Sequence, residues 1–127
     1  MHRNLLLTII TLVLTTGCYK TLELEGFDKQ KWTSHGNDCT NYRMEVVDHL
    51  LKNDSVLLES TQNEIESLLG RADEHELYER NQKFFHYRLS TPSNCAETDA
   101  ISFLSLRFNA MGRVNLAQVM LREPEGN

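Results

Sequence analysis

The residues with the chemistry to bind a metal or to act as acid, base or nucleophile fall in two short stretches. His35, Asp38 and Cys39 could form a metal or nucleophile site, and residues 73–76 (Asp-Glu-His-Glu) a metal or acid–base cluster. The trio lacks a second clustered pair of ligands, and consecutive residues such as 73–76 point in different directions. The sequence therefore predicts a solvated acidic loop at 73–76 and no metal site.

The sequence also lacks the common catalytic motifs. It contains no G-x-S-x-G, P-loop, H-E-x-x-H or C-x-x-C pattern. His49 lies beside the apolar stripe of a predicted helix, where a boundary residue is expected rather than a ligand. We therefore expect no enzymatic activity, no catalytic residues and no cofactor. A hydrolase would need a nucleophile, and no residue stands out as one.

The first 20 residues are typical of an export signal. Arg3 precedes an apolar run at residues 5–14, and Leu-Thr-Thr-Gly-Cys follows at 14–18. The run is shorter than the ~20 residues that a membrane-spanning helix needs, and a positive start, an apolar centre and small residues define a secretory signal. Residues 14–18 resemble a bacterial lipobox. This predicts removal of residues 1–17 and lipidation of Cys18, the alternative being an ordinary cleaved signal.

Lipidation of Cys18 has consequences for location and for the other cysteines. Acyl chains such as palmitate would anchor the protein to a membrane. The residue after Cys18 is Tyr19 and not Asp, which by the usual Gram-negative sorting rule predicts the outer membrane, with the protein facing the periplasm. Cys39 and Cys95 are then the one possible intrachain pair in a compartment that favours disulfides. We expect a structural Cys39–Cys95 bridge, and a metal or nucleophile site at Cys39 is the alternative.

Length and charge limit the remaining possibilities. The chain has 127 residues, 13 Lys+Arg and 18 Asp+Glu, giving a formal net charge of −5. This length suits about one domain, and the acidic balance argues against nucleic acid as a partner. We predict a lipidated tether at 18–36, a domain at 37–123 and a loose tail at 124–127.

Two helices are predicted in the first half of the domain. At residues 40–52, apolar side chains recur at helical spacing opposite charged ones. At 61–70, Thr61 and Glu64 form a T-x-x-E capping box, and Gly70 supplies the left-handed residue that ends a helix. The start and stop signals of the second helix agree with its apolar face.

Three strands are predicted in the second half. Residues 83–90 and 101–108 alternate in character, and residues 83–90 are rich in aromatic side chains. A tight hairpin loop at 109–112 precedes a last strand at 113–121. Residues 71–79 are charged and ambiguous, and a strand that opens at Leu77 and Tyr78 and turns at Asn81 and Gln82 is the alternative there. The order predicts an α+β fold in which two short helices cover a three-stranded antiparallel sheet.

The chain resembles the SmpA/OmlA (BamE-like) family of small bacterial envelope lipoproteins in two stretches. These are T-Q-N-E-I-E-S-L-L-G-R-A-D and, after an aromatic strand, L-R-F-N-A-M-G-R-V. The resemblance covers roughly residues 57–121 and the lipobox. Ala72 stands where that family usually has proline. The matching residues are structural, so the resemblance implies a fold and, as partner, the machinery that assembles outer-membrane barrels.

Strand alternation predicts a partner-binding surface on the sheet. If the helices cover one face, the opposite face presents Phe84, His86, Arg88, Phe103 and Arg107 to solvent. Aromatic and arginine side chains are enriched at interface hot spots. The alternative is that the tether and residues 71–82 fold over this face and make it a second small core.

The sequence thus predicts a non-enzymatic, lipid-anchored periplasmic interaction module that contributes to outer-membrane protein assembly or envelope integrity. The alternative function is a periplasmic inhibitor or ligand-binding module that uses the exposed sheet face. Capture of barrel-assembly components would favour the first function, and capture of a secreted or periplasmic enzyme the second.

Overall fold

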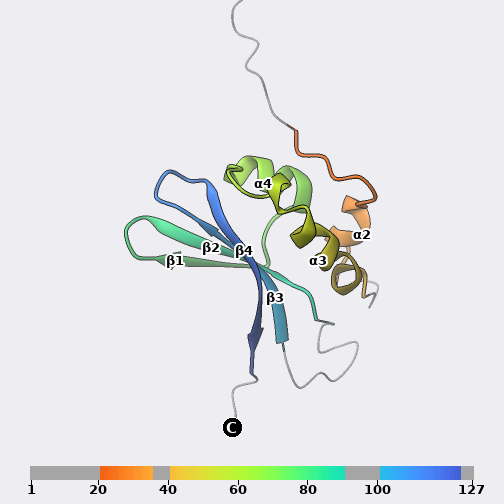
Figure 1. The fold of residues 1–127 in the computed structure, drawn as a ribbon. Coiled ribbons are helices and arrows are strands. Elements are labelled where there is room, and N and C mark those ends of the chain that lie inside the picture. Colours follow the sequence, from red (N-terminus) through yellow and green to blue (C-terminus); the bar gives the residue numbers. More distant parts are fainter. Residues whose placement is uncertain (1–20, 36–40, 91–100, 124–127) are drawn as a thin grey trace, which may run out of the picture.

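The computed structural model describes residues 21–35, 41–90 and 101–123 (Figure 1). The helices precede the strands along the chain and pack on one face of a single sheet, so the predicted α+β class is confirmed. The elements, in order, are α2 (Lys29–Thr33), α3 (Tyr42–Lys52), a 3-10 turn η1 (Asp54–Val56), α4 (Gln62–Leu69), β1 (Glu74–Tyr78), β2 (Gln82–Arg88), β3 (Ile101–Phe108) and β4 (Val114–Arg122).

The sheet has four strands, not the three predicted from the sequence. Its order is β1-β2-β3-β4, and all neighbours are antiparallel. The additional strand β1 pairs with β2 from Glu74 opposite His86 to Tyr78 opposite Gln82. All five β1 residues are exposed, so no alternation of apolar and polar residues marks this edge strand in the sequence. Residues 73–76, predicted as a loop, lie mainly in it.

Helix α4 begins and ends where the sequence predicts. The Thr61 side chain accepts a hydrogen bond from the Glu64 amide at 3.3 Å, and Gly70 ends the helix with a φ of 72°. A Cβ at Gly70 would lie 2.9 Å from Cγ2 of Thr33, so this glycine also lets α4 pack closely against α2. The Thr61 cap therefore sets the start of the helix, and the glycine sets its end and its contact with α2.

Helix α2 lies in the segment predicted as a tether. Asp28 caps this helix by accepting from the Lys31 amide, and Trp32 is fully buried. Leu22 is also buried in the core. Residues 22–35 therefore belong to the packed domain, because Leu22 and the indole of Trp32 bury their apolar surface there.

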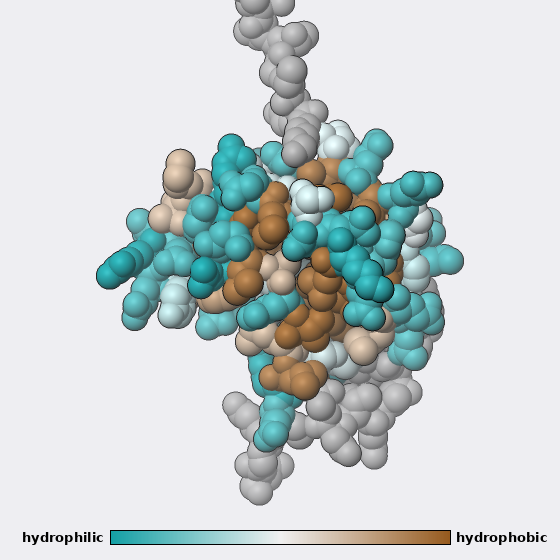
Figure 2. All heavy atoms as spheres, viewed as in Figure 1, coloured by the Kyte–Doolittle hydropathy of each residue, from teal (hydrophilic) through white to brown (hydrophobic). Residues whose placement is uncertain are grey.

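The apolar core lies between the sheet and the helices, and Figure 2 shows apolar side chains gathered in the middle of one face of the molecule. Every side chain predicted to face the helices is fully buried. Each such Leu or Phe stabilises the fold by about 1.5–3 kcal/mol. The Tyr87 hydroxyl donates to the Gly70 carbonyl at 2.8 Å, and burial raises the pKa of this phenol above its usual range. The predicted inward set is Phe85, Tyr87, Leu89, Leu104, Leu106 and Phe108.

The segment before α4 joins the helical layer to the last strand. The Glu59 amide donates to the Val114 carbonyl at 2.8 Å, and the Val114 amide donates to the Ser60 carbonyl at 2.9 Å. Thr61 forms an isolated bridge with Arg113, whose guanidinium also donates to the Glu59 carbonyl. These contacts fix the start of β4 against the helices.

Candidate functional site

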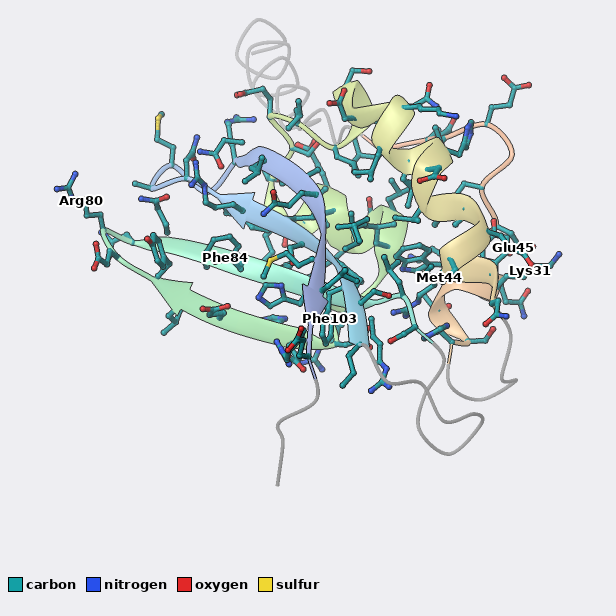
Figure 3. All side chains as sticks on the ribbon, turned by 60° about the horizontal axis from the view of Figure 1, so that its bottom comes forward. Lys31, Met44, Glu45, Arg80, Phe84 and Phe103 are labelled. Carbon is teal, nitrogen blue, oxygen red and sulfur yellow. The ribbon has the colours of Figure 1, made fainter. Side chains whose placement is uncertain are left out.

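The candidate site is the sheet face turned away from the helices, here called the outer face. The register places on it alternate residues of all four strands, because side chains opposite each other in an antiparallel pair point to the same side. Phe84 and Phe103 lie on this face of the sheet in Figure 3. Its members include Glu74, Glu76, Tyr78, Phe84, His86, Arg88, Phe103, Ser105, Arg107, Met120 and Arg122.

A row of ring contacts crosses the outer face. Tyr78 meets Phe84 edge to face with ring centroids 5.6 Å apart, and Phe84 stacks on His86 at 5.8 Å. His86 in turn contacts Phe103 at 6.0 Å. The row ends at Arg122, whose guanidinium carbon lies 4.6 Å from the centre of the Phe103 ring. Aromatic pairs of this kind stabilise by about 0.5–1.5 kcal/mol each beyond their buried area.

His86 is held at both ring nitrogens. Nε2 lies 2.9 Å from Oε2 of Glu76, and Nδ1 lies 2.6 Å from Oγ of Ser105. An ionised carboxylate only accepts hydrogen bonds, so Nε2 donates to Glu76, and the Ser105 hydroxyl can either donate to Nδ1 or accept from it. The two bonds fix the plane of the imidazole on which Phe84 stacks.

Glu76, His86 and Ser105 are the residue types of a Ser-His-acid catalytic array, but a substrate cannot reach the serine. The Ser105 residue is only 1% exposed, beneath its neighbours in the sheet. A nucleophile has to reach the substrate atom that it attacks, and a hydroxyl enclosed in this way has no approach path. In this conformation the array positions the aromatic row.

The prediction that all five outer-face residues are open to solvent is wrong for two of them. His86 is 2% exposed and Phe103 is 4% exposed, whereas Phe84, Arg88 and Arg107 are half-buried. Strand alternation placed them on the correct face. His86 and Phe103 are buried chiefly by Glu76 from β1 and Arg122 from β4. The sequence pattern did not predict that these two side chains lie beside them. The outer face therefore has a small core of its own with a partly exposed rim.

The rim is closed on one side by an ion pair between the two edge strands. The Arg122 guanidinium donates two hydrogen bonds to the Glu74 carboxylate, at 3.0 and 3.2 Å. This contact with Arg122 holds the pKa of the Glu74 carboxyl below its usual value. At the other end of the strands, Arg107 donates to the Asn115 side chain at 3.1 Å. Arg88 lies at the same end as the ion pair and donates to the Ser90 carbonyl at 3.3 Å.

A second polar cluster lies where α2, α3 and the end of β2 meet. Arg43 is buried and donates to the carbonyl oxygens of Trp32 and Arg88 at 2.8 and 2.9 Å. His35 lies beside it, with Nε2 3.0 Å from the Ser90 carbonyl oxygen. Burial, the largest cause, lowers the pKa of His35, so the folded state favours its neutral ring. This cluster joins helices to sheet and is structural.

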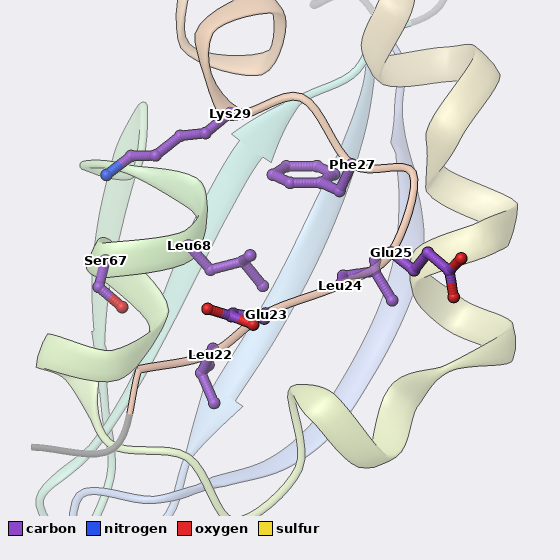
Figure 4. Close-up of a pocket in the computed structure, with 8 residues that line it drawn as sticks. All are labelled: Leu22, Glu23, Leu24, Glu25, Phe27, Lys29, Ser67 and Leu68. Atoms are coloured by element: carbon purple, nitrogen blue, oxygen red, sulfur yellow. The ribbon is translucent and has the colours of Figure 1, made fainter.

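One open cleft of about 520 Å³ lies between the extended segment after residue 21 and α4 (Figure 4). Its wall is apolar at Leu22, Leu24, Phe27 and Leu68. Glu23, Glu25, Lys29 and Ser67 supply the polar side chains around it. With acids outnumbering the single lysine, the lining offers no concentrated charge for an anion.

Other predicted site residues lie outside the described residues, namely Cys18, Cys39 and Cys95. Described residues on either side of the segments that hold Cys39 and Cys95 are in contact. His35 contacts Ser90, and Met44 Sδ lies 3.7 Å from Ser102 Oγ. Within the described ranges, no group of three or more His, Cys, Asp or Glu could hold a metal ion. No helix in those ranges is both long and apolar enough to cross a bilayer.

Comparison of the chain with protein-family models, with curated proteins and with solved structures finds no significant match. The resemblance to the SmpA/OmlA family thus stays a prediction.

Proposed function

We propose that the chain is a non-enzymatic interaction module, held by lipidated Cys18 at the outer membrane and facing the periplasm. It contributes to outer-membrane protein assembly or envelope integrity by binding another envelope protein. Barrel-assembly components are the first candidates, because the T-Q-N-E-I-E-S-L-L-G stretch and the hairpin at 109–112 resemble the SmpA/OmlA family.

The rim of the outer face carries this proposal. Tyr78 is exposed, and Phe84 and Arg107 are half-buried, so an aromatic and arginine surface stands in reach of solvent. His86 and Phe103 lie beneath it and are fixed by Glu76, Ser105 and Arg122. Aromatic and arginine anchors that are already ordered lose little conformational entropy on binding. The rim therefore suits a protein partner better than a small molecule, which prefers an enclosed pocket.

The test is photo-crosslinking from two neighbouring positions on β1. A photoreactive residue replaces Tyr78, on the outer face, or Leu77, which is exposed on the other face of the same strand. In a Gram-negative host that exports the full chain, we expect Tyr78 to capture a barrel-assembly component and Leu77 to capture much less of it. Capture of a periplasmic or secreted enzyme would instead support the inhibitor function. Equal yields from both positions would contradict a binding surface on the outer face.

A matched pair of substitutions then tests the rim itself. Arg107→Glu reverses a charge at the rim, and Lys52→Glu makes the same change at an exposed position on α3. We expect only Arg107→Glu to weaken partner capture, and neither to unfold the protein, because surface changes usually shift stability by within about 0.5 kcal/mol. Equal loss from both variants would mean that net charge, and not the rim, controls capture.

A further inference from the structure

The two edges of the sheet are protected very differently. Edge strand β1 has five residues, and Glu74, His75 and Glu76 are three of them. Edge strand β4 has nine residues, and positions 114–121 carry no charge and no proline. Proteins usually shield an edge with charge, proline or shortness, because its unpaired amides and carbonyls accept another strand. Strand β1 is shielded in two of these ways, and β4 in none.

The one charged residue of β4 is turned away from its open edge. Arg122 reaches across the outer face to the Phe103 ring and to Glu74 on β1. At the other end of the strand, the amide and carbonyl of Val114 are occupied by Ser60 and Glu59. After Val114, no strand in the described ranges pairs with the free edge of β4, which is the edge away from β3. The open edge is therefore neutral from Asn115 to Leu121.

Apolar side chains are exposed on both faces of this edge. Val119 and Leu121 lie on the helix-facing side, opposite Leu104 and Ser102, and Leu121 is 74% exposed. Met120 lies on the outer face and is also exposed. Their β3 partners are buried because β4 covers them, whereas nothing described covers β4. Met44, which projects from α3 towards the strands (Figure 3), adds a further exposed apolar side chain near Ser102.

We propose that β4 pairs with β4 of a second copy of this chain, antiparallel about a two-fold axis near Gln118, so that the two sheets become continuous. A two-fold axis perpendicular to the sheet keeps helix-facing side chains on the helix-facing side in both copies. Val119 then lies opposite Ala117 of the other copy on the helix-facing side, and Met120 lies opposite Leu116 of the other copy on the outer face. No charges oppose each other, because 114–121 has none.

Pairing with β1 of a second copy fits less well. It would set Glu74 and Glu76 beside the exposed apolar side chains of β4, where a carboxylate loses hydration. It is also a head-to-tail contact, which leaves an edge free at each end unless the copies close into a ring. The β4–β4 contact closes after two copies, since each copy offers one such edge.

Photo-crosslinking of the full-length chain tests the proposal. A photoreactive residue at Val119, on the helix-facing side of the open edge, is compared with one at the exposed Asn63 on α4. We expect a covalent product of twice the chain mass from position 119 and not from position 63. Crosslinks from 119 to a different protein alone, or no crosslink from 119, would overturn the proposal.

Charge substitutions give an independent readout on two differently tagged full-length copies. We expect Gln118→Lys or Gln118→Glu, present in both copies, to weaken co-purification by about fivefold, because like charges then meet at the axis. A Lys copy mixed with a Glu copy should recover co-purification, and Gln118→Asn in both should leave it unchanged. Equal losses in the like and the opposite pairings would overturn the two-fold geometry. Thermal melting of each variant checks that folding is intact.

Discussion

Nη1 of Arg43 lies 2.6 Å from Oδ2 of Asp73, and this ion pair joins helix α3 to the start of the sheet. The two partners differ in environment. The Arg43 side chain is almost fully buried, whereas that of Asp73 is 41% exposed. The arginine also lies 4.9 Å from the centre of the Trp32 ring. The contribution of the pair to stability should therefore depend on which partner is removed.

We expect Arg43→Met to lower the free energy of unfolding by about 3 kcal/mol, because it strips the carbonyls of Trp32 and Arg88 of their donor as well as breaking the ion pair. For Asp73→Asn we expect a smaller loss, about 1 kcal/mol, since water already solvates this carboxylate. Urea unfolding measures both. Lys52→Met is the exposed control, and a loss for Asp73→Asn as large as that for Arg43→Met would contradict the assignment.

The cluster also predicts a response to pH through His35. Its Nδ1 is buried with no hydrogen-bond partner, so protonation would place a buried charge there without an acceptor. Burial is the largest cause and lowers the pKa of His35 in the fold; Arg43 and Arg88 act in the same direction, and the Ser90 carbonyl and Asp73 oppose it. The unfolded chain then binds a proton more readily, and stability is lost as pH falls below about 6.5.

We expect the free energy of unfolding to fall less steeply between about pH 7 and about pH 5 in His35→Gln than in the unchanged protein. Glutamine can still donate to the Ser90 carbonyl, so the comparison isolates titration. His75→Gln, at an exposed position on β1, is the control and should keep the original slope. Identical slopes in all three proteins would exclude His35 as the titrating group.

The burial of Phe103 changes what a truncation on the outer face should do. We expect Phe103→Ala to destabilise by about 3–5 kcal/mol and Leu106→Ala, in the main core, by about 2–5 kcal/mol. Thermal melting distinguishes a second core from an open face. If Phe103→Ala leaves the melting temperature unchanged, the outer face lacks the small core described above.

The flanking contacts support the predicted Cys39–Cys95 disulfide. Because His35 meets Ser90 and Met44 meets Ser102, the segments holding the two cysteines start close together and end close together. Closing a loop of this length stabilises by up to about 4 kcal/mol in the chain-entropy model. We expect reductant to lower the melting temperature, and neither thiol of the exported protein to react with an alkylating agent beforehand. Full alkylation without reductant would rule the bridge out.

Anchoring is tested at Cys18. We expect Cys18→Ser to shift the protein from the membrane to the soluble fraction, because the acyl chains would supply its membrane affinity. Mass spectrometry of the unchanged protein should find a lipidated Cys18 as the first residue. A soluble protein with a free Cys18 thiol would contradict the lipobox prediction.

Periodic elements could be predicted from the sequence, and elements without a period could not. The capping box at Thr61 and the alternation around Phe85 identified α4 and β2 because one face of each is buried. Strand β1 has no buried face, and α2 is a single turn whose one buried side chain is Trp32. Neither of these two elements offers a repeat to detect.

The candidate site shows the same division between local and long-range information. Alternation within a strand correctly put His86 and Phe103 on one face. Their burial comes from Glu76 on β1 and Arg122 on β4, so it depends on the register between strands. The Glu76-His86-Ser105 array could not be read from the sequence for the same reason, since its members come from three strands.

The contacts of Glu59 and Ser60 with Val114 have a consequence for the order in which the chain folds. The segment before α4 gains these two hydrogen bonds only after the last strand has formed. Because the strands follow the helices in the sequence and cover their apolar faces, those faces of α3 and α4 stay uncovered until the sheet has formed. We therefore expect a chain truncated before β4 to leave both α3 and α4 poorly packed.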